Sequence, residues 1–410
     1  MSFSEWREVK LEEIIEIEMG QSPKSEFYNQ TGEGLPFLQG NRTFGDKYPY
    51  FDTYCTENKK IANTNDVIMS VRAPVGDLNI AQTKISLGRG VCAMRLKGEQ
   101  NSNYLFYLMK HNIKEMINRE SGTVFGSVNK KDILGLEVKI TNNKFEQKAI
   151  AHILSTLDDK IEVNNQINKI LEDMAKVIFK QWFVDYEYPN ENSEPYKSNG
   201  GEMVESELGM IPKGWEVKEL GEIIDIIKQG TKPGEHLKDR KYNPIDTLPM
   251  KSIAINDFKP YEEAKSSLIL FEKYDILIGA MRVYFHRVNL APYKGITRTT
   301  TFVLRSKRIQ DVPYNLFLLN MDETIDYAER TSKGSTMPYA VWDNGMSNIL
   351  VAYSNQELRN KFFQIIQPML ETIMKKSAEN EVLIKLRDSL LPKLMSGEIR
   401  VPLDEEGDVS

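Results

Sequence analysis

The sequence contains an internal repeat with a spacing of about 210 residues. Residues 6–17 (WREVKLEEIIEI) return as residues 215–226 (WEVKELGEIIDI), and residues 66–70 (DVIMS) return as residues 275–279 (DILIG). The repeat predicts two copies of one domain. A duplicated chain tends to fold with pseudo-two-fold symmetry, so the two halves are expected to be related in that way.

Residues 144–183 contain no glycine or proline, and apolar side chains recur there at alternating steps of four and three. This heptad seam predicts one uninterrupted helix of roughly 55–60 Å that needs a partner helix. The seam recurs in residues 362–394, so we expect the two helices to pair antiparallel; a parallel pair or pairing between two chains also fits the pattern. The predicted interface residues are Ile150, Leu154, Leu157, Ile161, Leu171, Ile178 and Trp182, with Phe362, Ile366, Met369, Ile373, Leu383, Leu390 and Leu394.

Polar residues interrupt both seams near the middle. They are Asn164 and Asn168 in the first helix and Lys376 and Asn380 in the second. Such a break can fix the register of a coiled coil, as buried asparagine does, or it can form a hydrated middle. We favour the hydrated middle, because two adjacent polar layers are costly to bury.

Each half is predicted to be an α+β unit, in which a mixed α/β globular domain precedes a long helix. Buried strands are expected at residues 67–72, 90–96, 276–282 and 299–305, and helices at 104–118 and 314–330. The expected divisions are a first domain (1–143), a first helix (144–184), an exposed linker rich in Pro, Asn, Ser, Glu and Gly (185–214), a second domain (215–354), a second helix (355–397) and a tail (398–410).

The composition excludes several classes of protein. No run of about 18 apolar residues exists, and the N-terminus is not a signal peptide, so neither a membrane span nor secretion is expected. The two cysteines, Cys55 and Cys92, form no CxxC motif, which fits a reduced cytoplasmic compartment without a zinc site.

Catalytic motifs are absent from the sequence. It has no GxxxxGK[ST] loop for ATP, and its one Asn-Pro, at Asn243, lacks the Pro-aromatic continuation of an amino-methyltransferase. A nuclease-like E-x-K pattern ends in Glu137 and Lys139 with Asp132 upstream, but the same pattern occurs twice elsewhere by ordinary composition. We therefore expect no catalytic residue and no bound metal in this chain.

The charge distribution points to anionic partners despite a formal net charge of −6. Residues 276–310 contain no Asp or Glu but several Arg and Lys, and residues 67–98 have one acid, Asp77, among their basic residues. Basic segments at the same repeat position predict two matching anion-binding faces that would contact nucleic acid, unless they are merely the solvent face of strands. With the flanking loops, the candidates are Gln21, Ser22, Lys24, Arg42, Arg72, Lys84, Arg89, Gln229, Thr231, Lys232, Arg282, Arg287, Lys294 and Arg298.

Several segments, taken in order, resemble the specificity subunit of Type I restriction–modification enzymes over nearly the full length. They are residues 146–161 (EQKAIAHILSTLDDKI), 178–185 (IFKQWFVD), 206–215 (SELGMIPKGW) and 390–398 (LLPKLMSGE). The second helix departs from the first in lacking the Glu-Gln opening, so partner contacts at the two helices need not be equal. The recognition domains are the variable part of that family, so no base-reading residue is carried over.

The resemblance implies a non-catalytic subunit with two target recognition domains, each reading half of a split double-stranded DNA site. It implies an antiparallel coiled coil that sets the gap and docks two methylating subunits, with motor-nuclease subunits completing the complex. S-adenosylmethionine, ATP and Mg²⁺ would then belong to partner subunits. The alternative from another class is a coiled-coil scaffold whose duplicated domains bind proteins and do not contact DNA.

Overall fold

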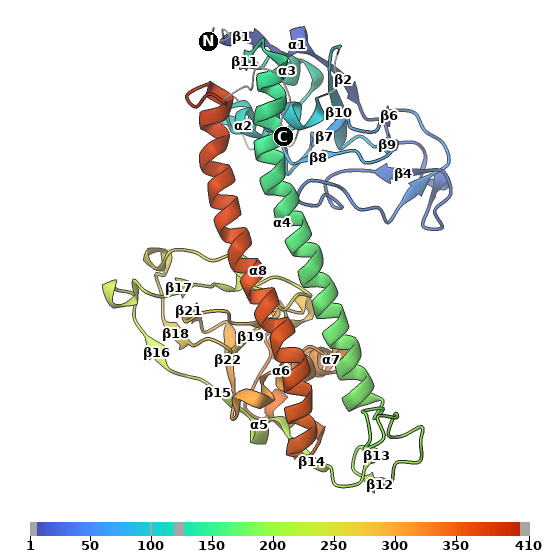
Figure 1. Cartoon of the computed structure of the whole chain (residues 1–410), viewed down its shortest axis with the longest axis vertical. Coiled ribbons are helices and arrows are strands. Elements are labelled where there is room, and N and C mark those ends of the chain that lie inside the picture. The colour runs from blue at the N-terminus through green and yellow to red at the C-terminus, as the bar shows by residue number, and fades with distance from the viewer. Residues whose placement is uncertain (1–5, 99–100, 119–126, 402–410) are drawn as a thin grey trace. The chain divides into compact units, whose positions relative to one another are not determined.

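The computed structural model describes residues 6–98, 101–118 and 127–401 (Figure 1). Residues 1–5 of the predicted first domain and 402–410 of the predicted tail lie outside the described residues. The chain divides into two compact units, Met1–Glu162 with Leu383–Ser410, and Val163–Val382. Each unit therefore holds one globular domain and a part of both long helices, α4 (Lys144–Phe179) and α8 (Gln356–Ser396).

The described residues of the first unit's domain form three sheets. A four-stranded sheet has the order β2-β10-β7-β8 (Ile15–Met19, Val91–Leu96, Val67–Ser70, Leu78–Ile80). Strand β1 (Trp6–Lys10) pairs antiparallel with β11 (Glu137–Thr141). A further sheet has the order β3-β5-β4-β9-β6 (Tyr28–Asn29, Tyr54–Cys55, Leu35–Leu38, Ile85–Leu87, Ile61–Ala62), and the helices are α1 (Leu11–Ile14), α2 (Ser102–Asn118) and α3 (Lys130–Leu134).

The domain of the second unit repeats this plan. Its main sheet has the order β15-β22-β19-β20 (Ile224–Ile226, Thr301–Ser306, Ile276–Gly279, Val288–Leu290), and β14 (Glu216–Glu219) pairs antiparallel with β23 (Leu350–Tyr353). The same strand order in both units confirms the predicted duplication. Its other sheet has the order β16-β18-β21-β17 (Gly230–Thr231, Leu268–Phe271, Gly295–Arg298, Lys241–Tyr242), and its helices are α5 (Leu220–Ile223), α6 (Val312–Leu319) and α7 (Asp322–Arg330).

Two predicted elements differ from the structure. The helix expected over residues 314–330 is broken into α6 and α7, because every residue of α6 is buried whereas α7 buries only one face, so one straight helix cannot serve both. The predicted exposed linker contains a hairpin of β12 (Met203–Ser206) and β13 (Gly209–Pro212), and the Tyr188 ring stacks on Tyr196 and Trp215.

Two arginines of the basic segments form ion pairs with buried aspartates inside the domains. The Arg95 guanidinium donates to both carboxylate oxygens of the buried Asp66, at 3.0 and 2.6 Å. Arg305 makes the matching pair with Asp275, with both distances at 2.7 Å. Because the pair occurs at the same place in both sheets, these arginines stabilise the repeated domain and are not free for a ligand.

The two long helices run antiparallel within each unit. In the first unit, Arg387 of α8 lies 2.6 Å from Asp158 of α4, and the Tyr107 hydroxyl donates to the same carboxylate at 2.5 Å. In the second unit, Asn164 of α4 meets Asn380 of α8, and Asn168 meets Ser377. Residue numbers therefore increase along α4 in the direction in which they decrease along α8. The pair is an antiparallel coiled coil, as predicted.

The polar middle of the helix pair is a buried hydrogen-bonded layer. Asn164 is fully buried and Asn380 is 3% exposed, and the Asn164 Nδ2 donates to the Asn380 Oδ1 at 2.8 Å. The Asn380 Nδ2 donates in turn to the Asn165 Oδ1 at 2.8 Å. Direct bonds between side chains therefore hold part of this layer, whereas the buried Oδ1 atoms of Asn164 and Asn168 accept no hydrogen bond from the described residues.

The predicted seam residues also enter the domain cores. Ile150, Leu154 and Leu394 belong to the apolar core of the first unit, and Leu390 packs against it. Trp182, Phe362, Ile366 and Ile373 belong to that of the second, with Leu171, Ile178 and Met369 packed against it. Ile161 is buried, and Leu157 and Leu383 are partly buried. Each helix stretch is thus held by a domain as well as by the other helix.

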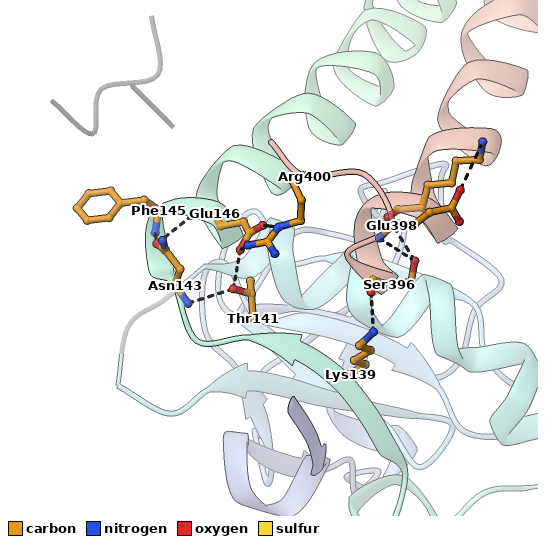
Figure 2. A network of polar contacts seen from close by, with 9 residues as sticks. Lys139, Thr141, Asn143, Phe145, Glu146, Ser396, Glu398 and Arg400 are labelled. Atoms are coloured by element: carbon orange, nitrogen blue, oxygen red, sulfur yellow. Dashed lines mark hydrogen bonds and ion pairs between the residues drawn. The ribbon is translucent and has the colours of Figure 1, made fainter. Parts of the chain in front are cut away.

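The end of α8 closes the first domain. The Arg400 guanidinium binds the buried Glu146 carboxylate at 2.6 and 3.1 Å, and the Lys139 Nζ donates to the Ser396 carbonyl at 2.9 Å (Figure 2). Gly397 lies against the Trp6 ring, where a Cβ would come within 2.7 Å of a ring atom. The first domain is therefore completed by residues from the far end of the chain.

No helix among the described residues is long and apolar enough to cross a membrane.

Candidate nucleic-acid interface

In the first domain, the loop after β2 lies against the turn between β9 and β10. The Gly20 N–H donates to the Val91 carbonyl at 3.0 Å and the Gln21 N–H to the Leu87 carbonyl at 2.9 Å. A Cβ at Gly20 would lie 2.1 Å from the Gly88 carbonyl oxygen, so only glycine permits this approach. The contact brings three predicted residues, Gln21, Ser22 and Arg89, to one place.

A second segment joins this group through the strand end of β7. The Val71 N–H donates to the Gly90 carbonyl at 2.8 Å, and Arg72 follows directly. The side chains of Arg72 and Arg89 are both exposed. The first domain thus presents two arginines, on a strand end and a turn that are bonded to each other.

The second domain contains the matching arrangement. The Ala280 N–H donates to the Thr300 carbonyl at 2.9 Å, and the exposed Arg282 and Arg298 flank this bond. The register of the two sheets shows which positions correspond. Arg282 lies one residue after the position that corresponds to Arg72, and Arg298 lies one residue before the position that corresponds to Arg89. Equivalent segments therefore carry arginine in both domains, although not at identical positions.

Arg282 begins an unusual segment of the second domain. Its φ is 51°, in the left-handed region, and so is that of His286 at 54°. The Arg282 N–H donates to the Pro338 carbonyl at 2.8 Å, which ties it to a hairpin closed by Lys333 and Tyr339. Left-handed backbone at residues other than glycine is costly and often marks a functional segment.

The hairpin adds exposed apolar side chains that sequence reasoning missed. Met337 is 54% exposed and Tyr339 49% exposed, and the exposed Tyr284 follows Arg282 by two residues. Residues 333–335 (KGS) match the first half of the internal repeat, but neither the repeat nor a charge pattern singles out residues 336–339. The bond between Arg282 and Pro338 is what places the hairpin beside Arg282, and it appears only in the folded chain.

Thr231 and Arg298 share one row of a sheet. Thr231 of β16 lies opposite Leu268 of β18, which lies opposite Arg298 of β21. Directly paired residues project from the same face of a sheet, so Thr231 and Arg298 do so as well. Lys232 and Gln229 flank Thr231 and are exposed, and Lys294 is exposed just before β21.

Other predicted residues already have partners. Arg42 is exposed but makes a two-point bond with Asp52, at 2.7 and 2.8 Å. Lys24 lies 3.5 Å from Glu26. Lys84 is a separate case, and its side chain is exposed. Arg287 is partly buried and donates to the Leu248 carbonyl, so it serves the packing of the domain and is the weakest of the predicted DNA contacts.

Burial and neighbouring groups shift the pKa of two tyrosines, one in each domain. Burial raises the pKa of Tyr28, and the nearby Arg89 opposes that shift. Burial likewise raises the pKa of Tyr242, and Arg298 opposes it.

Residues of the nuclease-like pattern have structural roles. Lys139 bonds to the Ser396 carbonyl, and the Asp132 side chain accepts from the Asn129 N–H at 2.9 Å as part of the cap of α3. Among the described residues, no group of three or more His, Cys, Asp or Glu is placed to hold a metal ion.

These observations define a class: a duplicated α+β protein in which paired domains, each with exposed basic loops, are joined by an antiparallel helix pair. Comparison with known families identifies the class. Residues 3–173 and 212–344 match the family described as Type I restriction modification DNA specificity domain. The chain belongs to this family.

Relatives and solved structures agree with that assignment. The chain is 27% identical to the Type I restriction enzyme MjaIX specificity subunit of Methanocaldococcus jannaschii, over 97% of this chain and 94% of the relative. It is 24% identical to the HindI specificity subunit of Haemophilus influenzae, over 73% of this chain and 79% of the relative. The S subunit of a Type I system from M. genitalium has the same fold, with a TM-score of 0.61 at 17% identity and coverage of 96% of both chains.

Proposed function

We propose that each domain reads one half of a bipartite DNA site with its arginine-bearing loops. The observation that carries this proposal is the matched pair of exposed arginines, Arg72 with Arg89 and Arg282 with Arg298, held by equivalent backbone bonds in both domains. Arginine binds phosphates and the base edges of guanine. Two such loop sets in one chain suit a split site.

The helix pair would set the gap between the half-sites. Its polar layer and the ion pair between Asp158 and Arg387 fix which residues of α4 and α8 face each other. A pair of helices with a fixed register has a fixed length, so it suits the role of a spacer.

The chain itself would carry out no chemistry. S-adenosylmethionine, ATP and Mg²⁺ would be bound by the methylating and motor-nuclease subunits of the complex.

A second apolar seam on α4 supports docking of a methylating subunit. Val163, Ile170, Met174 and Val177 are between 47% and 65% exposed, and Ile167 completes alternating steps of four and three with them. This seam lies one residue before the seam that faces α8, so it occupies the adjacent face of the helix. An exposed heptad seam is the surface that a partner helix covers.

Charge reversal tests the DNA proposal. We expect Arg282→Glu with Arg298→Glu to weaken binding of the assembled complex to its DNA by tenfold or more, because phosphate or base contacts are replaced by repulsion. The salt dependence of binding should also become shallower. Gel shifts at two salt concentrations measure both effects.

Lys265→Glu is the matched control, since Lys265 is exposed in the same domain but lies outside the basic loops. It should bind DNA as the unaltered complex does. If the arginine variant also bound normally, the alternative of a protein-binding scaffold would be favoured.

The docking proposal has its own test. Ile170→Asp with Val177→Asp should abolish co-purification of the methylating subunit, because two carboxylates would be buried in an apolar contact. Lys169→Asp places a carboxylate on another, exposed face of α4 and should leave assembly intact. Normal assembly of the double variant would place the methylating subunit elsewhere.

A further inference from the structure

We propose that Gln39 reads a base edge in the half-site of the first domain and that Ser22 is the residue that positions it. The inference rests on the proposed function, and it adds a residue that the charge and repeat patterns do not single out. Gln39 follows β4 directly, and its side chain is exposed beside the arginine turn.

A short relay of hydrogen bonds orients the Gln39 amide. The Arg89 N–H donates to the Ser22 Oγ at 3.1 Å, and the Ser22 hydroxyl donates to the Gln39 Oε1 at 3.1 Å. Because the serine oxygen accepts from Arg89, its proton is directed to the amide oxygen. The Gln39 NH₂ group then points away from Ser22 as a donor.

The backbone of Gln39 is held as firmly as its side chain. The Gly90 N–H donates to the Gln39 carbonyl at 3.0 Å, and the Gly88 N–H donates to the Leu38 carbonyl at 2.8 Å. A Cβ at Gly90 would lie 2.4 Å from the Gln39 carbonyl oxygen, and one at Gly88 would lie 2.8 Å from the Gln39 Cα. This close packing presents Gln39 in one orientation, which base reading requires.

The chemistry favours a base over a phosphate. Gln39 is neutral and is flanked by the exposed Arg89, which is the better partner for a phosphate. An oriented amide NH₂ suits an acceptor on a base edge, such as guanine N7 or O6, or thymine O4. We therefore assign Arg89 mainly to affinity and Gln39 to specificity.

The second domain has no equivalent reader. Val91 and Thr301 hold equivalent positions at the start of β10 and β22. Four residues before each of them, Leu87 corresponds to Thr297. In the first domain Leu38 pairs with Leu87, and in the second Tyr242 pairs with Ile296. The residue after Tyr242 therefore lies opposite Thr297 and corresponds to Leu38. The next residue, Pro244, corresponds to Gln39. Proline has no side-chain donor, so the two half-sites should differ at this base pair.

The test measures base preference with the assembled complex, using a DNA library in which the first half-site is randomised. Gln39→Ala should reduce discrimination at one base pair by about tenfold or more and leave the other positions unchanged. Ser22→Ala should weaken preference at the same base pair, and Ser22→Thr, which keeps the hydroxyl, should restore it. Gln30→Ala, a change of another exposed glutamine in the same domain, should alter nothing.

The possible results test the proposed function and the reading role of Gln39 separately. If the unaltered complex shows no sequence preference, the proposed function fails. If it does show one, and Gln39→Ala keeps every preference or weakens binding equally at all sequences, the reading role of Gln39 is overturned. Gln39→Glu preserves the size of the side chain and should disfavour the same base pair, which covers the case in which the alanine variant folds poorly.

Discussion

At the scale of single residues, the fold divides the basic residues of each half between two tasks. Arg95 and Arg305 form ion pairs with the buried Asp66 and Asp275, whereas the exposed Arg89 and its counterparts lie on loops or at a strand end. Both kinds lie in the same basic stretch of sequence. Sequence alone predicts the charge of the stretch but not this division, which depends on which side of a strand faces the core.

Removing either arginine–aspartate ion pair should lower the stability of its domain, whether or not DNA is present. Arg95→Ala should lower the free energy of unfolding of the first domain by about 2 kcal/mol, because Asp66 would remain buried without its counter-ion. Arg305→Ala should do the same in the second domain. Hydrogen exchange, followed separately for each domain, checks both changes.

Arg89→Ala and Arg298→Ala are the controls, and each should change stability by no more than about 0.5 kcal/mol, since both side chains are exposed. Equal destabilisation by all four substitutions would show that the division between structural and exposed arginines is mistaken.

The candidate site was predictable only in part, for a physical reason. Charge and repeat position identified Arg72, Arg89, Arg282 and Arg298, which lie together in the fold as pairs. They could not identify Gln39, because its role depends on bonds to residues 22, 88 and 90 that form only when loops distant in sequence meet.

At the scale of elements, the heptad seam predicted both helices and their pairing, because apolar periodicity is a local signal. It did not predict which side chains of the polar middle bond to each other. Asn164 and Asn380 are hydrogen-bonded across the two helices, and a partner for an asparagine cannot be predicted from its own helix. The geometry favours a register-fixing role for this layer.

The layer predicts a distinctive pair of variants. Asn164→Leu should destabilise the helix pair by about 1–3 kcal/mol, since the buried Asn380 Oδ1 loses its donor. Adding Asn380→Leu should recover most of that stability, because an apolar layer replaces the unpaired amide. Thermal unfolding of the three proteins gives the comparison.

Lys169→Leu, on an exposed position of the same helix, controls for the added apolar surface and should leave the melting temperature nearly unchanged. Similar losses in the single and double variants would mean that the amide pair is not coupled, and the register-fixing role would then have to be abandoned.

At the scale of the whole molecule, duplication was the strongest prediction, because two copies of a sequence give two copies of a sheet order. The repeat did not predict that the segment after α8 completes the first domain through Gly397 and Arg400. That closure joins segments more than 250 residues apart, as the separation of Glu146 and Arg400 shows. Neither segment carries a local signal for it.

The spacer role makes the final prediction. Removing residues 163–169 together with residues 376–382 deletes one heptad from each helix. It takes out the whole polar layer, so no amide is left unpaired, and it keeps the ion pair between Asp158 and Arg387. Seven helical residues span about 10 Å, which is about three base pairs of DNA, so the gap in the site should shorten by that amount.

The half-site sequences should stay the same, because the loops that carry Arg72, Arg89, Arg282 and Arg298 are untouched. Mapping the methylated sites of DNA exposed to each assembled complex measures gap and half-sites together. Deleting the heptad from α4 alone is the control, and it should abolish methylation, since the remaining layer residues would face the wrong partners. An unchanged gap in the double deletion would show that the helix pair does not set the spacing, even if both domains read DNA.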